Sequence, residues 1–128
     1  MKDSNLNVNN NLNLCYAIED ALEQADAIKY HLDKISNDIK MVEKSLNQMP
    51  HFEFEFVIPE SGYSISWKRY PESKNKSYFL FLIDIDRKYK RLGDCNISLK
   101  TRFYPYLKSF IDNFALYLKK QRILLEGK

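Results

Sequence analysis

The sequence predicts an α+β protein, and three observations lead to this fold class. Apolar residues recur at alternating steps of four and three along residues 12–49, a spacing typical of a long helix. After Pro50 the apolar residues alternate one by one, as they do in the strands of a half-buried sheet. A helical spacing then resumes over residues 101–125. The 128 residues have the length of one domain, preceded by a polar and flexible arm expected over residues 1–11.

The long N-terminal helix is predicted to carry a coiled-coil seam. Its apolar residues follow the narrow stripe of a heptad repeat rather than the broad apolar face of an ordinary globular helix. About 36 helical residues would span roughly 54 Å, more than a small sheet of four strands can cover. We therefore expect a homodimer through the seam, the alternative being a helix that bends or breaks over its own domain. The seam consists of Leu14, Ile18, Ala21, Ala25, Ile28, Leu32, Ile35, Ile39, Val42 and Leu46.

Two acidic residues flank this seam. Asp38 and Glu43 would face each other across a parallel, in-register pair of helices, where like charges repel. The repulsion of one exposed pair is worth only tenths of a kcal/mol, so on this ground the sequence favours an antiparallel pair only slightly.

Residues 52–99 are predicted to form an antiparallel meander of three or four strands. Two alternating segments, residues 52–58 and 63–70, are joined by the turn residues 59–62. Pairing them as a hairpin places Phe54 near Trp67 and Ile58 near Tyr63. A third strand is expected over residues 77–86 and a short fourth strand over residues 95–99, after a basic loop.

The third strand is apolar on both faces, which is typical of a central strand that is covered twice. Both predicted helices are expected on one face, so the other face is a candidate partner surface. The alternative is that the N-terminal arm or long side chains from neighbouring strands shield it. The candidate partner surface, with the basic loops beside it, consists of Tyr78, Leu80, Leu82, Lys74, Lys76, Arg87, Lys88, Lys90 and Arg91.

The C-terminal helix is predicted to start with Thr101 as its N-cap and to end at Gly127. Pro105 would then lie early enough in this helix to be tolerated. We expect the helix to pack on one face of the sheet beside the N-terminal helix.

Charge is divided unevenly along the chain. Residues 1–60 carry 5 basic and 11 acidic side chains, whereas residues 61–128 carry 15 basic and 6 acidic ones. Such asymmetry is typical of a nucleic-acid-binding surface, with cations and rings mixed in the loops after the second and third strands. It equally fits an acidic helix that packs beside a basic sheet and helix. An affinity that falls steeply with salt would favour nucleic acid.

The sequence contains no clear catalytic motif, so we do not expect an enzyme, and no cofactor is predicted. Neither His31 nor His51 has a Cys or Ser at a spacing that would indicate nucleophilic catalysis. Cys15 and Cys95 are interpreted as small buried side chains in a reducing, cytoplasmic compartment. Asp84 and Asp86 share one strand face and would hold a hard cation if the protein were a metal-dependent enzyme. No apolar run is long enough to cross a membrane.

The stretch from ISWKRY through SYFLFLID to RLGDCNISLKTRFYPYLKSFI resembles small uncharacterised bacterial and phage-type proteins. The resemblance covers residues 61–128 and implies a β-meander followed by a helix. It implies no catalytic residues.

These observations predict a non-enzymatic protein-binding module that associates with itself and with another protein. Its class would be a stoichiometric inhibitor or adaptor, including mobile-element proteins that block a host or defence complex. The alternatives are a nucleic-acid-binding protein and a metal-dependent enzyme.

Overall fold

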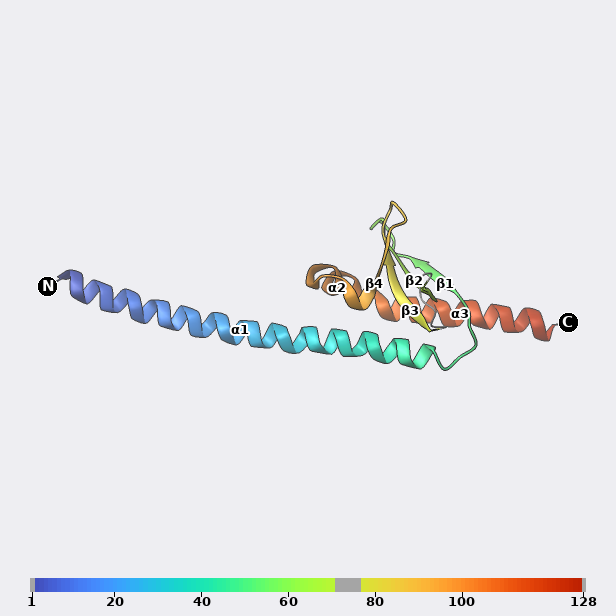
Figure 1. The fold of residues 1–128 in the computed structure, drawn as a ribbon, viewed down its shortest axis with the longest axis horizontal. Coiled ribbons are helices and arrows are strands. Elements are labelled where there is room, and N and C mark those ends of the chain that lie inside the picture. The colour runs from blue at the N-terminus through green and yellow to red at the C-terminus, as the bar shows by residue number, and fades with distance from the viewer. Residues whose placement is uncertain (1, 71–76, 128) are drawn as a thin grey trace. The chain divides into compact units, whose positions relative to one another are not determined.

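The structure is a computed structural model that describes the backbone of residues 2–70 and 77–127 and the side chains of residues 12–70 and 77–127. The chain divides into two compact units, residues 1–34 and residues 35–128, each described by itself below. Figure 1 shows helices at both ends of the sequence and an antiparallel sheet between them, which confirms the predicted α+β class.

Unit 1 is helical. Helix α1 (Lys2–Leu46) runs through it and continues into the first residues of unit 2. The sequence predicted a polar and flexible arm over residues 1–11 and a helix from residue 12; the helix instead begins at Lys2. The Asn-rich start lacks any glycine or proline, and asparagine lowers helix propensity far less than either of these residues does. Helix α1 is continuous, so the alternative of a helix that breaks is not what the structure shows.

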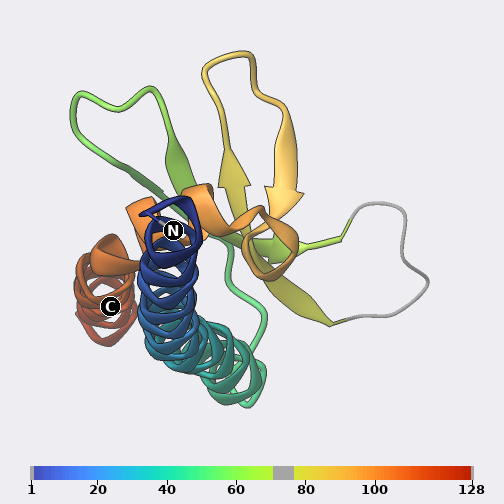
Figure 2. The same ribbon diagram turned by 90° about the vertical axis from the view of Figure 1, so that its left-hand side faces the viewer.

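Unit 2 is built on a four-stranded antiparallel sheet with the order β1-β2-β3-β4. Its strands are β1 (Phe54–Val57), β2 (Ser64–Arg69), β3 (Tyr78–Ile83) and β4 (Tyr89–Arg91). The helices of this unit are residues 35–46 of α1, α2 (Ile97–Phe103) and α3 (Leu107–Glu126). Figure 2 shows that the helices lie on one side of the sheet.

The first hairpin has the predicted register. Phe54 pairs with Trp67 in β1 and β2, and the backbone N–H of Ile58 donates to the carbonyl oxygen of Tyr63 at 2.9 Å. The turn between them is held by the Ser61 hydroxyl, which donates to the Ile58 carbonyl at 2.8 Å and accepts from the Tyr63 N–H at 3.0 Å. Gly62 has a φ of 74°, a conformation that glycine adopts without steric cost.

The core of unit 2 lies between the sheet and the helices. Trp67, Ile65 and Leu80 from the central strands are almost completely buried, and Phe110 and Phe114 of α3 pack against them. Burying each aromatic or aliphatic side chain of this size stabilises the fold by about 1.5–3 kcal/mol. All residues of the buried cluster come from positions 35–114, so the core belongs to unit 2.

The fourth strand is not where the sequence placed it. Strand β4 forms within the predicted basic loop and pairs Tyr89 with Ile83 and Arg91 with Phe81. Residues 97–99, predicted as a strand, start helix α2, because the Asn96 side chain caps the helix by accepting from the Leu99 N–H at 2.9 Å. A run of five residues is too short for its apolar pattern to distinguish a strand from the first turn of a helix.

The C-terminal helix is two helices rather than one. Helix α2 ends at Phe103, and a 3₁₀ turn, η2 (Tyr104–Tyr106), separates it from α3. Pro105 lies in this turn, where its missing N–H and fixed φ do not disturb an α-helical ladder. Thr101 is therefore inside α2 and caps nothing, whereas the predicted end at Gly127 is confirmed by the capping position of that residue after α3.

Candidate functional site

The predicted seam divides into two halves with different environments. In unit 1 its large side chains are exposed: Leu14 by 59%, Ile18 by 56% and Ile28 by 56%. We call the exposed half the helix stripe and define it as Leu14, Ile18, Ala21, Ala25 and Ile28. Leu32, at the end of unit 1, is half-buried. The helix stripe is thus an apolar surface of about two heptads on the described part of unit 1.

The other half of the seam is not available for a dimer, which corrects the sequence-based prediction. Ile35, Ile39 and Val42 are buried in the core of unit 2, and Leu46 packs against the same core. A heptad stripe buries one helix face, but the spacing alone does not state whether a second copy or the chain's own sheet covers it.

The charges around the helix stripe are placed favourably for contact with a second helix. The positions that flank the stripe in the heptad are occupied by residues without a carboxylate, namely Cys15, Ala17, Leu22, Gln24, Lys29 and His31. The carboxylates of this segment fall on the outer heptad positions, namely Glu19, Asp20, Glu23 and Asp26. Two stripes can therefore meet without burying an acidic group.

The sequence-based argument for an antiparallel pair does not hold, because both of its residues are used inside unit 2. Asp38 accepts a hydrogen bond from the Tyr104 hydroxyl, and Glu43 is 8% exposed and points at strand β3. Neither carboxylate lies at the margin of a coiled coil, so they give no information about the orientation of a dimer.

Glu43 of helix α1 and Asn47, the residue after its end, close the free edge of strand β3. Strand β4 pairs with β3 only from Phe81 to Ile83, so the outward backbone groups of Tyr78 and Leu80 have no strand beside them. The Asn47 side chain pairs with the N–H and the carbonyl of Tyr78, both at 3.0 Å, and the Glu43 carboxylate accepts from the Leu80 N–H at 2.8 Å. An open strand edge, which would invite another chain to pair, is thereby blocked.

Sequence reasoning missed this role of Glu43 and Asn47, since their partners are backbone groups more than thirty residues away. Burial raises the pKa of the Glu43 carboxyl above its ordinary value, an effect larger than the lowering by the Leu80 N–H and by Arg91. Asn47 also donates to the carbonyl of Glu43 at 2.8 Å, which helps to end α1 at Leu46 rather than at the predicted residue 49.

The apolar part of the predicted partner surface is buried, and this prediction is wrong. Tyr78, Leu80 and Leu82 are 9%, 0% and 4% exposed, and they face the helices in the core of unit 2. The sequence predicts correctly that β3 is apolar on both faces. We expected the helices on the face opposite to Tyr78, Leu80 and Leu82, and the structure places them on the face that carries these residues. The face that the helices leave uncovered carries Phe79, Phe81 and Ile83.

That outer face is shielded by long side chains of neighbouring strands, the alternative that the sequence left open. The Lys68 ammonium lies 5.4 Å from the ring centre of Phe81 and 4.2 Å from that of Tyr89. The Arg91 guanidinium lies 3.8 Å from the ring centre of Phe79 and 3.9 Å from the Glu43 carboxylate. These cation–π contacts cover the rings, so Phe81 is completely buried.

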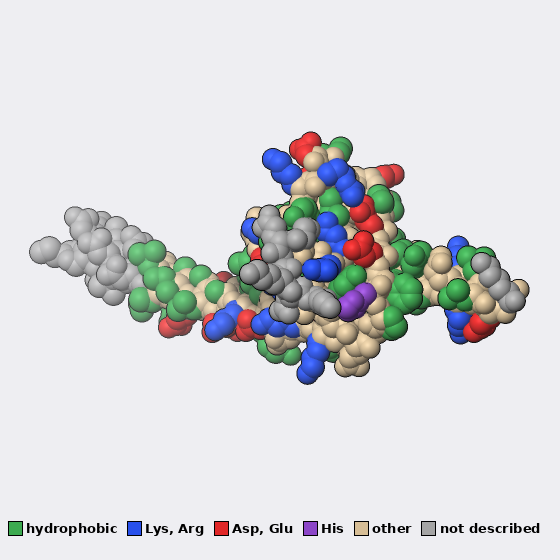
Figure 3. Space-filling model, turned by 45° about the vertical axis from the view of Figure 1, so that its right-hand side comes forward, with side chains coloured by type: hydrophobic (Ala, Val, Ile, Leu, Met, Phe, Trp, Pro, Cys, Tyr) green, Lys and Arg blue, Asp and Glu red, His purple; other side chains and the backbone are tan. Residues whose placement is uncertain are grey.

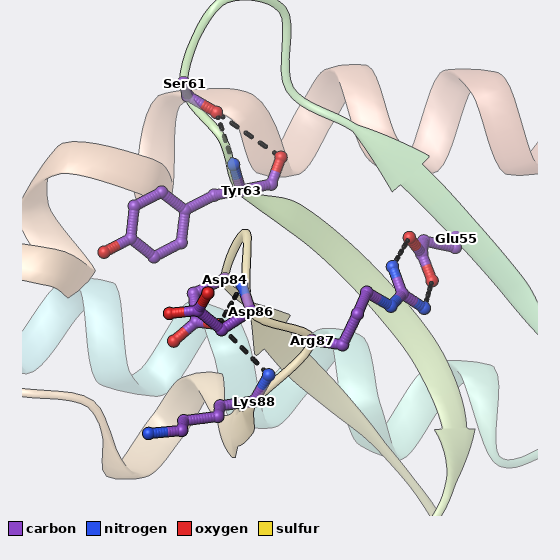
Figure 4. A network of polar contacts seen from close by, with 7 residues as sticks. All are labelled: Glu55, Ser61, Tyr63, Asp84, Asp86, Arg87 and Lys88. Atoms are coloured by element: carbon purple, nitrogen blue, oxygen red, sulfur yellow. Dashed lines mark hydrogen bonds and ion pairs between the residues drawn. The ribbon is translucent and has the colours of Figure 1, made fainter.

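Arg87 adds an ion pair across the same face. Figure 4 shows its guanidinium facing the Glu55 carboxylate of β1, with two hydrogen bonds of 2.8 and 3.0 Å. These bonds lower the pKa of the Glu55 carboxyl below its ordinary value. Figure 3 shows the result as basic and acidic side chains mixed over the upper part of the molecule rather than a continuous basic patch.

The remaining basic residues of the predicted partner surface have mixed positions. Lys88 and Lys90 are exposed, whereas Lys74 and Lys76 lie outside the described residues. Because Arg87 and Arg91 each lie near a carboxylate, the described part of the surface is partly neutralised. This arrangement gives little support to the nucleic-acid alternative, which requires unpaired cations along a phosphate backbone.

Asp84 shapes the turn between β3 and β4 (Figure 4). One carboxylate oxygen accepts from the N–H groups of Asp86 and Lys88, at 2.9 and 3.0 Å. Among the described residues, no group of three or more His, Cys, Asp and Glu side chains is placed to hold a metal ion. The carboxylate of Asp84 is therefore explained by turn formation.

The two histidines and the two cysteines lie in different environments. His31 meets the ring of Tyr30 edge-on, and His51 stacks on Tyr78 with ring centres 4.8 Å apart. Cys95 is buried as expected, and burial raises the pKa of its thiol. Cys15 is exposed, which corrects its interpretation as a core residue.

An apolar groove lies on unit 2 between the segment that follows α1 and the C-terminal half of α3. It has a volume of about 700 Å³. We call it the α3 groove; it is lined by Met49, Pro50, Phe52, Ala115, Leu118, Lys119, Gln121, Arg122 and Leu125. Sequence reasoning placed these residues in the long helix, in the first strand and in the C-terminal helix, and did not bring them together.

Comparisons of the chain with protein-family models, with curated proteins and with solved structures found no match. Within the described residues, every helix is too short or too polar to span a bilayer.

Proposed function

We propose that this protein is a non-catalytic protein-binding module that self-associates through the helix stripe. The observation that carries the proposal is the exposure of Leu14, Ile18 and Ile28 at heptad positions, each by more than half. A narrow stripe of this period is complementary to a second stripe of the same kind. Such a module would act as an adaptor or a stoichiometric inhibitor.

The expected affinity follows from the size of the stripe. Two copies contribute six large side chains, and full burial of each is worth about 1.5–3 kcal/mol, of which only the exposed half is still to be gained. Association costs roughly 4–15 kcal/mol in lost freedom of the partners. At its most favourable the balance leaves only about 5 kcal/mol for association, which predicts a weak dimer with a dissociation constant of roughly 0.2 mM.

Sedimentation equilibrium of the full chain tests the proposal. The double variant Ile18→Glu, Ile28→Glu places four carboxylates in the dimer interface, and we expect it to be monomeric at concentrations where the wild type is dimeric. The matched control is Tyr16→Glu, Tyr30→Glu, because both tyrosines are exposed but lie on the outer heptad positions of the same helix.

The control variant should dimerise like the wild type. A wild type that stays monomeric at about 100 μM, or a control that dissociates as readily as the double variant, would contradict the proposal. Circular dichroism of all three proteins checks that the helices are intact.

A further inference from the structure

The α3 groove has the shape of a helix-binding site. Its wall on α3 is made by residues 115, 118, 119, 122 and 125, which follow one face of that helix and extend over about 15 Å. The floor is apolar: Leu118 packs on the core, and Leu125 and Phe52 remain 74% and 37% exposed. Figure 3 shows hydrophobic side chains at the surface of the C-terminal helix, beside basic ones.

The rim of the groove is basic. Lys119 lines it and has no ion pair with any carboxylate in the described part of the chain. Arg122 also lines it and contacts Glu126 at 3.6 Å, but both side chains are about two-thirds exposed. An exposed pair of this kind contributes little to stability, so Arg122 can exchange Glu126 for a carboxylate of a partner.

We propose that the α3 groove binds an acidic amphipathic helix of a partner protein. The inference rests on the proposed function as a protein-binding module and names the chemistry of the partner. Apolar residues spaced i, i+3, i+4 and i+7 on the partner fill the floor between Phe52 and Leu125, as in other helix-in-groove complexes. Carboxylates beside that apolar face meet Lys119 and Arg122, and this pairing disfavours basic helices.

Two synthetic peptides of about four helical turns are the probes. Both carry leucine at i, i+3, i+4 and i+7; the remaining positions are mainly glutamate in the acidic probe and mainly lysine in the basic probe. Titration of the full-length protein, followed by fluorescence anisotropy, should give at least about tenfold tighter binding of the acidic probe. Equal binding of the two probes, or no binding of either, would overturn the inference.

Two pairs of exposed residues provide matched variants. Leu125→Ser and Lys119→Glu alter the groove, whereas Leu124→Ser and Lys120→Glu make the same changes at neighbouring positions of α3 outside its lining. We expect each groove variant to weaken the acidic probe about tenfold and each control to stay within about twofold of the wild type. Equal losses in groove variants and controls would contradict a site in the groove.

The titration is repeated with the monomeric variant Ile18→Glu, Ile28→Glu. Unchanged binding of the acidic probe to this variant separates the groove from the helix stripe, so that either proposal can fail alone. A peptide of residues 12–34 of this chain that binds the groove more tightly than the acidic probe would assign the groove to a second copy and overturn the inference.

Discussion

The carboxylate of Glu43 in helix α1 accepts a hydrogen bond of 2.8 Å from the backbone N–H of Leu80 in strand β3. A side chain of the helix thus occupies the place that a neighbouring strand would take in a wider sheet. The contact fixes the position of residues 35–46 along β3, since moving the helix by one turn would leave a buried donor without a partner.

Replacement of Glu43 should change how stability depends on pH. Because burial raises the pKa of the folded carboxyl above its ordinary value of 4.5, the folded state binds more protons than the unfolded state between those two pKa values. The free energy of unfolding of the wild type therefore declines as pH rises from 4.5 through the raised pKa. Glu43→Gln keeps an acceptor for the Leu80 N–H and cannot ionise, so this decline should be absent.

Denaturant titrations of both proteins between about pH 4 and pH 7 measure the difference. Glu43→Ala is the companion variant: it leaves the Leu80 N–H unpaired and should lower the free energy of unfolding by about 1–3 kcal/mol across this range. Parallel pH profiles for the wild type and Glu43→Gln would show that the carboxyl does not titrate as described.

Arg87 combines a favourable ion pair with an unfavourable backbone conformation. Its φ of 63° lies in the left-handed region, and its guanidinium pairs with Glu55. Arg87→Ala loses the pair and keeps the strain, so it should be less stable than the wild type. Arg87→Gly loses the pair but relieves the strain, and should be more stable than Arg87→Ala by roughly 1 kcal/mol. Thermal melts that rank alanine above glycine would refute this explanation.

Variants of Asn96 and Thr101 test whether the helix is capped at the observed position or at the one predicted from sequence. Asn96→Ala removes the bond to the Leu99 N–H and should cost about 1 kcal/mol of unfolding free energy. Thr101→Ala changes an exposed residue inside α2 and should stay within about 0.5 kcal/mol of the wild type. Both values come from urea unfolding followed by the fluorescence of Trp67, which is buried in the core. The reverse order would place the helix start at Thr101.

Removal of residues 1–34 should leave a folded protein. All members of the buried core cluster lie at position 35 or beyond, so truncation removes no core side chain. We expect residues 35–128 to unfold cooperatively with a midpoint within a few degrees of the full chain, measured at dilutions where the full chain is monomeric. Light scattering should show a monomer at every concentration. A truncated protein without cooperative unfolding would mean that unit 1 contributes to the core.

The sequence alone determined the elements whose evidence is local. Heptad spacing identified α1, alternation identified β1, β2 and β3, and the pairing of Phe54 with Trp67 followed from matching two apolar faces across a turn. Local evidence failed where two structures share one spacing. Residues 97–99 fit either a strand or the first turn of a helix, and the Asn96 cap favours the helix.

Only the tertiary structure decided which surfaces are free. Side-chain periodicity shows that a face is apolar, but it does not identify what covers that face. Ile35, Ile39 and Val42 of the predicted dimer seam are therefore buried in the core of unit 2. The helices cover the face of β3 that carries Leu80 and Leu82 rather than the opposite face. The lining of the α3 groove and the hydrogen bond that the Leu80 N–H donates to Glu43 both join residues far apart in sequence. Long-range contacts of this kind have no periodicity, so the sequence does not reveal them.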